Sequence, residues 1–173
     1  MAITATIDVK DKDILGSLQG FFKDILETEE IQSLLVPQHL PMKNMVMPTL
    51  VTDPNHLNGV DPLSPAFPIN AAKIVSRLTR KPMGAKFAAV LRPCEIRAFV
   101  ELVKLKQGRT EEVILIGVDC SGAFQNKDYF QLVEHNAAES TAVVTRARPS
   151  SEPAGPTPAT MPRHSSRSSP ASS

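Results

Sequence analysis

The sequence predicts an α/β protein built on a partial open parallel sheet, because an amphipathic stretch separates two short, almost wholly apolar segments. Residues 86–92 are Lys-Phe-Ala-Ala-Val-Leu-Arg, and residues 113–118 are Val-Ile-Leu-Ile-Gly-Val. Near-continuous apolar strands are typical of parallel sheets, in which helices cover both faces. A strand, a helix and a second strand in this order predict a parallel βαβ crossover.

Three earlier segments are predicted from periodicity and capping residues. Apolar residues recur at helical spacing through residues 12–28, which indicates an amphipathic helix. Residues 37–68 are rich in proline, so we expect an irregular connection there, with one strand-like segment at residues 49–52. A second helix is expected to begin at Asn70, a good N-cap residue, and to run through Leu78.

The helix of the predicted crossover is expected over residues 95–107, with Gly108 as its stop signal. Ile96, Phe99, Val100 and Val103 recur on one face of this helix, which predicts that this face packs on the sheet. Glu95 and Glu101 are expected on the opposite, solvated face rather than as an acid/base pair.

The chain is expected to hold one domain, at residues 1–136, followed by a disordered tail at residues 137–173. The tail consists mainly of Ser, Pro, Ala, Thr and Arg, with Val143, Val144 and Met161 as its large apolar residues. A segment of this composition cannot bury enough apolar surface to offset the conformational entropy lost on folding.

Composition and charge argue against several classes of protein. The formal net charge is +1, and Lys and Arg form no long run before the tail, so a specific nucleic-acid surface is not expected. The start of the chain has no basic segment followed by an apolar one, and the aliphatic run at residues 113–118 is too short to span a bilayer. Two cysteines without a leader fit a reducing compartment, so we expect a cytoplasmic protein without membrane insertion.

Both cysteines follow predicted strands. Cys94 comes after Pro93 at the start of the crossover helix, and Cys120 comes at the end of the second strand. In a parallel sheet both strands end at one edge, where ligands usually bind, so both thiols are expected to face a common crevice. The exposed N–H groups of a helix N-terminus would favour a metal-binding thiolate at Cys94. The alternative from spacing alone is that both cysteines are buried as small apolar residues.

Other catalytic and metal-binding motifs are missing. No CxxC, HExxH, GxGxxG, P-loop or GxSxG pattern occurs, so zinc, dinucleotide, nucleotide and serine-hydrolase sites have no support. The four histidines are scattered and are interpreted as ordinary surface or loop residues: His39, His56, His135 and His164.

Three further motifs are Phe67-Pro-Ile-Asn-Ala-Ala-Lys-Ile-Val-Ser-Arg-Leu-Thr-Arg80, Ala89-Val-Leu-Arg-Pro-Cys-Glu-Ile-Arg-Ala98 and Ile116-Gly-Val-Asp-Cys120. Together these motifs resemble the coenzyme F420 hydrogenase/dehydrogenase beta-subunit family. The proline-rich segment Leu40-Pro-Met-Lys-Asn-Met-Val-Met-Pro-Thr-Leu-Val51 is similar to the formate dehydrogenase and hydrogenase-associated branch of this family. The resemblance covers about residues 35–130, which correspond to an early portion of a typical member.

The resemblance implies an electron-transfer subunit that uses FAD and a 4Fe–4S cluster. Such subunits relay electrons between a soluble electron carrier and a partner oxidoreductase of the hydrogenase, formate dehydrogenase or heterodisulfide-reductase type. Cys94 and Cys120 would then be cluster ligands. The residues that would contact the flavin phosphates are Asn70, Lys73, Arg92 and Arg97.

The sequence departs from the family in one respect. The later cysteine-rich segment, which supplies further cluster ligands, has no counterpart here, so the chain is expected to be truncated. A 4Fe–4S cluster normally takes four cysteines, and two cannot complete one without another chain. We therefore expect the chain to be inactive or weakly active alone. Two alternatives remain: a non-enzymatic docking module of a redox complex, and a dithiol redox protein using Cys94 and Cys120.

Overall fold

The computed structural model describes residues 6–9, 12–40, 43–82, 84–120, 122–125 and 129, without the side chains of residues 43 and 44. The predicted tail at residues 137–173 lies outside the described residues. The elements follow in this order: α1 (Ile14–Glu27), β1 (Ser33–Leu40), β2 (Lys43–Val51), the 3-10 helix η2 (Pro54–Gly59), α2 (Ala72–Leu78), β3 (Phe87–Leu91), α3 (Pro93–Lys104) and β4 (Val113–Gly117).

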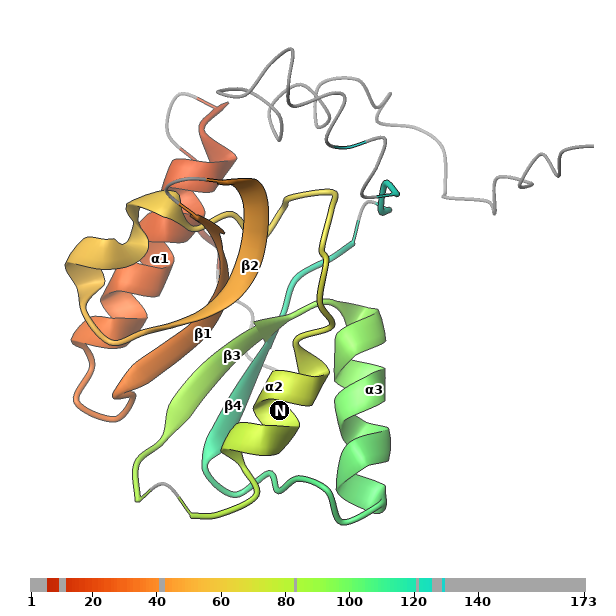
Figure 1. Cartoon of the computed structure of the whole chain (residues 1–173). Helices are drawn as coiled ribbons and strands as arrows, with labels where there is room; N and C mark the ends of the chain where they lie inside the picture. Colours follow the sequence, from red (N-terminus) through yellow and green to blue (C-terminus); the bar gives the residue numbers. More distant parts are fainter. Residues whose placement is uncertain are drawn as a thin grey trace, which may run out of the picture.

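The described strands form one open sheet in the order β2-β1-β3-β4 (Figure 1). β3 pairs in parallel with both β1 and β4, whereas β1 and β2 form an antiparallel pair. The predicted α/β class and the parallel unit β3-α3-β4 are therefore confirmed. The sheet is mixed rather than wholly parallel, because β2 runs against its neighbour.

The expected irregular connection at residues 37–68 was wrong, because much of it belongs to the β1–β2 hairpin. Pro37 and Pro48 stand opposite each other in the register of this hairpin. Proline removes a ladder donor, but the parallel pairing of β1 with β3 ends at Leu35, so Pro37 interrupts no pairing with β3. The prolines are compatible with the hairpin because Pro37 lies beyond the pairing of β1 with β3 and Pro48 lies on the outer strand β2.

The helices occur where periodicity predicts them, with differences at their ends. Asp13 caps α1 by accepting the Gly16 N–H at 2.8 Å. Asn70 accepts the Ala72 N–H at 2.9 Å just before α2, but the N-cap residue is Ala71, one position later than the sequence predicts. α3 begins earlier than expected, at Pro93, which suits a first helical position. It also ends before Gly108, the predicted stop signal, because its last residue is Lys104.

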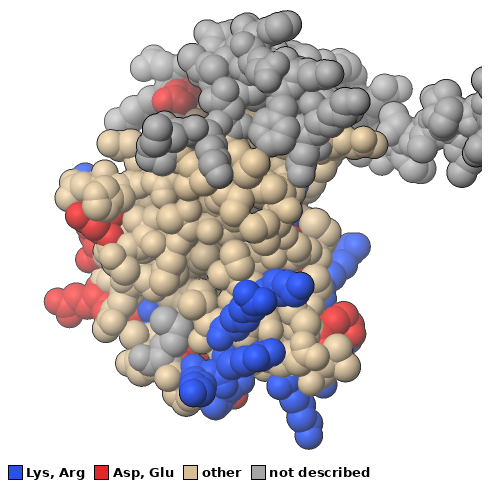
Figure 2. All heavy atoms as spheres, viewed as in Figure 1, with Lys and Arg blue, Asp and Glu red and all other residues tan. Residues whose placement is uncertain are grey.

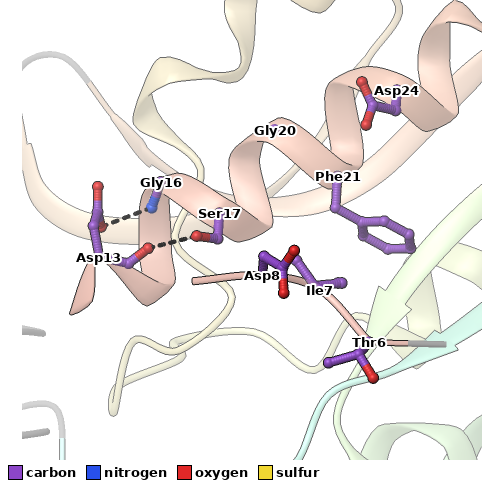
Figure 3. A pocket seen from close by; sticks show the side chains of 9 residues that line it. All are labelled: Thr6, Ile7, Asp8, Asp13, Gly16, Ser17, Gly20, Phe21 and Asp24. Carbon is purple, nitrogen blue, oxygen red and sulfur yellow. Dashed lines mark hydrogen bonds between the residues drawn. The ribbon is translucent and has the colours of Figure 1, made fainter. Parts of the chain in front are cut away.

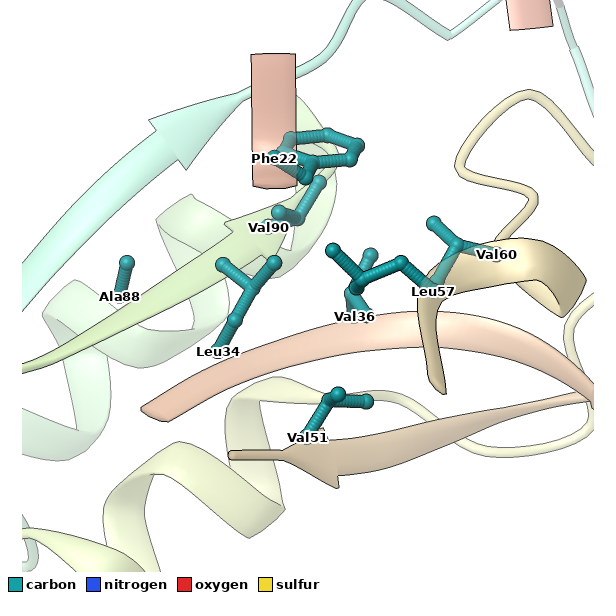
Figure 4. Close-up of a cluster of buried hydrophobic side chains, with 8 residues drawn as sticks. All are labelled: Phe22, Leu34, Val36, Val51, Leu57, Val60, Ala88 and Val90. Atoms are coloured by element: carbon teal, nitrogen blue, oxygen red, sulfur yellow. The ribbon is translucent and has the colours of Figure 1, made fainter. Parts of the chain in front are cut away.

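Each face of the sheet carries its own hydrophobic core, as strand alternation requires. On one face α1 inserts Phe22 against Leu34, Val36, Ala88 and Val90 (Figure 4). On the other face α2 and α3 pack on the alternate residues of the same strands, and the buried members of that core are Leu35, Ala71, Ala72, Val75, Phe87, Ala89, Leu91 and Phe99. The sheet is therefore a middle layer between α1 and the α2–α3 pair (Figure 1).

β4 is less buried than its apolar sequence predicts. All five residues of β3 are buried, but Ile114 in β4 is 40% exposed, and Val113, Leu115 and Ile116 are only partly buried. β4 is the last strand of the sheet, and among the described residues no strand pairs with its outer edge. None of the described helices has the length and the apolar character that a membrane span requires.

Candidate functional site

The two thiols lie at equivalent positions beyond neighbouring parallel strands. Leu91 at the end of β3 is in register with Gly117 at the end of β4. Cys94 and Cys120 each follow three residues later. Because β3 and β4 run in the same direction, both cysteines belong to the carboxyl edge of the sheet, where α/β proteins usually bind ligands.

Both cysteines are exposed, and neither forms a disulfide. Cys94 is the second residue of α3, directly after Pro93. Cys120 follows β4 by three residues. The alternative that both cysteines are buried as small apolar residues is therefore wrong.

Arg92, the N-cap residue of α3, is a buried cation at this edge and is only 9% exposed. Its guanidinium carbon lies 3.2 Å from the centre of the Phe67 ring, in a cation–π contact. Its Nη2 also donates a hydrogen bond to the Ser64 carbonyl oxygen. These contacts anchor the segment that precedes α2 to the start of α3.

Electrostatics connect Arg92 to both thiols. Burial lowers the pKa of Arg92 below its ordinary value, because the charged form loses solvation. Neighbouring acidic groups act in the opposite direction by attracting the guanidinium, and these groups, in decreasing order of effect, are Cys120, Glu95, Cys94 and Asp61. The two thiols therefore share one positively charged neighbour.

The prediction that Glu95 lies on a solvated helix face was wrong, since this side chain is 4% exposed. Its Oε1 accepts the Ala71 N–H at 2.8 Å, and its Oε2 accepts the Arg92 N–H at 3.1 Å. Helix periodicity alone misplaced Glu95 because the segment before α2 covers the first turn of α3. A glutamate at the third helical position, two residues after proline, is a capping signal that would have indicated this role.

His39 and Asp61 form a second polar pair that sequence reasoning missed. His39 Nε2 lies 3.1 Å from Asp61 Oδ2, and the Asp61 side chain is 1% exposed. His39 is near the carboxyl end of β1, which is parallel to β3, so the pair lies toward the same edge as the thiols. The interpretation of His39 as an ordinary surface residue was therefore wrong. His39 and Asp61 are far apart in the sequence, so no local sequence pattern predicts that they pair.

The remaining predicted residues surround the same edge. Asn70, Lys73 and Arg97 are exposed, although the Asn70 side chain already accepts the Ala72 N–H. Arg97 is three residues after Cys94, so the two are neighbours on the helix surface. Lys73 lies in the first turn of α2. Arg92 differs from these residues, since its guanidinium is buried against protein groups.

A cavity of about 730 Å³ lies elsewhere, between the N-terminal segment and α1 (Figure 3). Its lining includes Asp8, Asp13 and Asp24 but none of the residues described at the carboxyl edge of the sheet. Asp13 already accepts the Gly16 N–H. The cavity therefore adds no group to the carboxyl edge of the sheet, called the cysteine edge below because Cys94 and Cys120 lie there.

The donor set is too small for a complete 4Fe–4S cluster. The whole chain contains two cysteines, whereas such a cluster normally takes four. Among the described residues, no group of three or more His, Cys, Asp and Glu side chains is placed to hold a metal ion. Cys94 and Cys120 would provide half of a ligand set. The exposed cations Lys73 and Arg97 have the charge that phosphate groups require.

Comparison of the sequence with known proteins gives similarity to subunits of oxidoreductases. No protein family model matches the sequence. The chain is similar to the beta subunit of an F420-dependent formate dehydrogenase from Methanocaldococcus jannaschii, with 24% identity over 119 residues. It is also similar to F420-dependent formate dehydrogenase 1 subunit beta from Methanococcus maripaludis, with 26% identity over 121 residues.

These two matches confirm the family resemblance predicted from the sequence motifs. Each match covers 69% of this chain. The matched region spans 31% of the first relative and 30% of the second, so the chain corresponds to about a third of their length.

Proposed function

We propose that the chain is part of an electron-transfer subunit that relays electrons between a soluble carrier and a partner oxidoreductase in the cytoplasm. Its similarity to two formate dehydrogenase beta subunits supports an oxidoreductase complex as the setting. By the same resemblance, the partner would be of the formate dehydrogenase, hydrogenase or heterodisulfide-reductase type. FAD and a 4Fe–4S cluster would be the electron carriers, with the missing cluster ligands coming from another polypeptide segment.

The observation that carries this proposal is the position of the two thiols. Cys94 and Cys120 follow neighbouring parallel strands at equivalent positions, and both are exposed. Both also interact with the charge of Arg92. A buried cation beside two cysteine ligands would offset the negative charge that they carry when bound to a metal cluster.

The other residues have separate roles in the proposal. Lys73 and Arg97 would attract the flavin phosphates, since both are exposed cations. Asn70 would present the start of α2 to the same groups while its side chain accepts the Ala72 N–H. Arg92 would act on the flavin phosphates and the thiolates through its charge, because its guanidinium is held by Phe67 and Ser64.

Anaerobic reconstitution of the full chain tests the proposal. The chain is incubated with FAD, ferrous iron and sulfide, desalted, and examined by visible spectroscopy and iron analysis. We expect bound flavin and substoichiometric iron–sulfur absorption, with the iron lost in Cys94→Ala and in Cys120→Ala. Val100→Ala, on an exposed position of α3, serves as the control and should retain both. Equal iron uptake by a variant lacking both cysteines would rule out the proposed ligands.

A dithiol redox protein is the second candidate, favoured by the exposure of two unbonded thiols at one sheet edge. Oxidised glutathione followed by mass spectrometry separates the candidates. A dithiol protein would form an internal disulfide with loss of two hydrogens, and a reductant would regenerate the two thiols. Two separate glutathione adducts would exclude this candidate, because they would show that the thiols do not reach each other.

A further inference from the structure

Charge is distributed unevenly along the chain. Residues 62–94 contain no Asp or Glu, but they contain six basic residues: Lys73, Arg77, Arg80, Lys81, Lys86 and Arg92. Arg92 is buried, and Lys86 forms an ion pair with Glu30. The other four are exposed on α2 or directly after it. Three of them, Arg77, Arg80 and Lys81, are called the α2 basic face below.

The α2 basic face lies apart from the thiols. Arg77 is near the C-terminal end of α2, and Arg80 and Lys81 follow the helix toward β3, away from the edge where α2 begins. Figure 2 shows basic side chains gathered over the region that α2 occupies in Figure 1. Within the described part of the chain, none of the three takes part in a salt bridge. Lys73 continues this surface toward the cysteine edge.

Local helix stability explains only one cation of this surface. Lys73 and Arg77 are four residues apart within α2, and like charges at this spacing destabilise a helix. Lys73 also lies near the positive end of the helix dipole, whereas Arg77, in the last turn, lies near the favourable negative end. α2 has only seven residues and is held by the burial of Ala72 and Val75. The cations therefore add repulsion to a helix whose stability comes from packing.

The opposite face of the sheet has the opposite charge. Acidic residues gather in and around α1, namely Asp8, Asp13, Asp24, Glu27, Glu29 and Glu30. α1 covers one face of the sheet, and α2 and α3 cover the other. A negatively charged partner would thus be attracted to α2 and repelled from α1, which gives both orientation and a faster encounter.

We propose that the α2 basic face docks an acidic surface of the protein that exchanges electrons with this chain. The inference rests on the proposed function for the role of that partner. A protein fits better than a single-stranded nucleic acid, because residues 72–82 include no aromatic side chain for stacking on bases. Ile69, just before α2, is 40% exposed, and Ile74 is partly buried. Apolar side chains beside a polar rim are typical of protein interfaces.

Binding to poly-L-glutamate, used as the acidic polypeptide probe, tests the surface. The α2 variant combines Arg77→Glu, Arg80→Glu and Lys81→Glu. The matched control combines Lys23→Glu, Lys86→Glu and Lys104→Glu, which changes the net charge equally at cations that already have acidic neighbours. Circular dichroism establishes that both variants fold. We expect about a tenfold loss of affinity at about 0.1 M salt in the α2 variant and less than about threefold in the control, because charges beyond the Debye length of about 10 Å are largely screened.

Three results would overturn the proposal. Equal losses of affinity for poly-L-glutamate in the two variants would show that binding depends only on net charge. A duplex DNA that binds more tightly than poly-L-glutamate, with the same dependence on the α2 residues, would assign the surface to nucleic acid. A salt-sensitive dimer that the α2 variant abolishes would assign it to a second copy of this chain through the acidic residues around α1.

The same variants separate this inference from the proposed function. The α2 basic face contains none of the residues assigned to the flavin or the cluster, so the α2 variant should reconstitute like the unaltered chain. If the unaltered chain binds poly-L-glutamate through α2 but takes up neither flavin nor iron, the proposed function fails while the docking surface stands. If it takes up both but the α2 variant binds poly-L-glutamate normally, only the docking surface fails.

Discussion

Glu95 Oε1 lies 2.8 Å from the backbone nitrogen of Ala71, which belongs to the segment that opens α2. The other carboxylate oxygen of Glu95 accepts the Arg92 N–H at the start of α3. One buried carboxylate therefore joins the beginnings of two helices. Because Cys94 lies between Arg92 and Glu95 in sequence, this joint fixes the backbone that presents the thiol.

Replacing Glu95 with alanine should destabilise the fold by about 2–4 kcal/mol, because two buried N–H groups and the neighbouring guanidinium lose their partner. Chemical denaturation measures this change in the free energy of unfolding. Glu101→Ala is the matched control on α3, since Glu101 forms an exposed pair with Lys104 and should matter by less than about 0.5 kcal/mol. Similar small losses in the free energy of unfolding in both variants would show that the Glu95 hydrogen bonds do not hold the two helices together.

Arg92→Lys should cost about 1–2 kcal/mol, although it conserves the charge, because lysine cannot both stack on Phe67 and donate to Ser64 in the same geometry. Thermal and chemical unfolding provide the measurement. Arg97→Lys, at an exposed position of the same helix, should leave stability within about 0.5 kcal/mol of the original. An Arg92→Lys variant as stable as Arg97→Lys would contradict the importance of the planar guanidinium.

Two glycine substitutions should have opposite effects. A Cβ at Gly108 would lie 3.2 Å from Phe99 Cε2 and 3.2 Å from Thr79 Oγ1, so Gly108→Ala should destabilise by about 1–3 kcal/mol through overpacking. A Cβ at Gly20 in α1 would meet nothing within 4 Å, so Gly20→Ala should stabilise by about 0.5–1 kcal/mol through helix propensity. The midpoints of denaturation of the two variants measure these changes in stability. A Gly108→Ala variant more stable than the original chain would contradict the tight packing of residue 108 on α2.

Asp53 should contribute to the pH dependence of stability. Its pKa is lowered chiefly by the hydrogen bond from the Asn55 N–H, so the ionised carboxylate favours the folded state. This contribution is present above the ordinary pKa range of Asp and is lost as the pH falls through the lowered value. The stability advantage of the original chain over Asp53→Asn should therefore be larger at about pH 6 than at about pH 2.

Urea denaturation across this pH range measures the difference. Asn58→Ser is an exposed change in the same 3-10 helix that involves no titrating group. The free energy of unfolding of this control variant should depend on pH in the same way as that of the original chain. A difference between the original chain and Asp53→Asn that stays constant with pH would show that the carboxylate charge is not what stabilises the cap.

Local sequence patterns were sufficient for much of the fold. Periodicity predicts the helices α1 and α2, and the two apolar segments around residues 86–92 and 113–118 predict β3 and β4 and their parallel pairing. The placement of Cys94 and Cys120 after these strands follows from the same short-range signals. Such features depend on residues close together in the chain, so their spacing is visible in the sequence.

Tertiary structure alone decided the features that depend on distant segments. The hairpin at β1 and β2 contains facing prolines that locally favour a loop, and strand pairing overrides that preference. Glu95 has the helical position of a solvated residue, yet a segment 24 residues earlier covers it. His39 and Asp61, 22 residues apart, pair only once β1 and the segment after η2 meet. In each case the environment of a side chain is set by which distant backbone packs against it, and helix or strand periodicity does not encode that information.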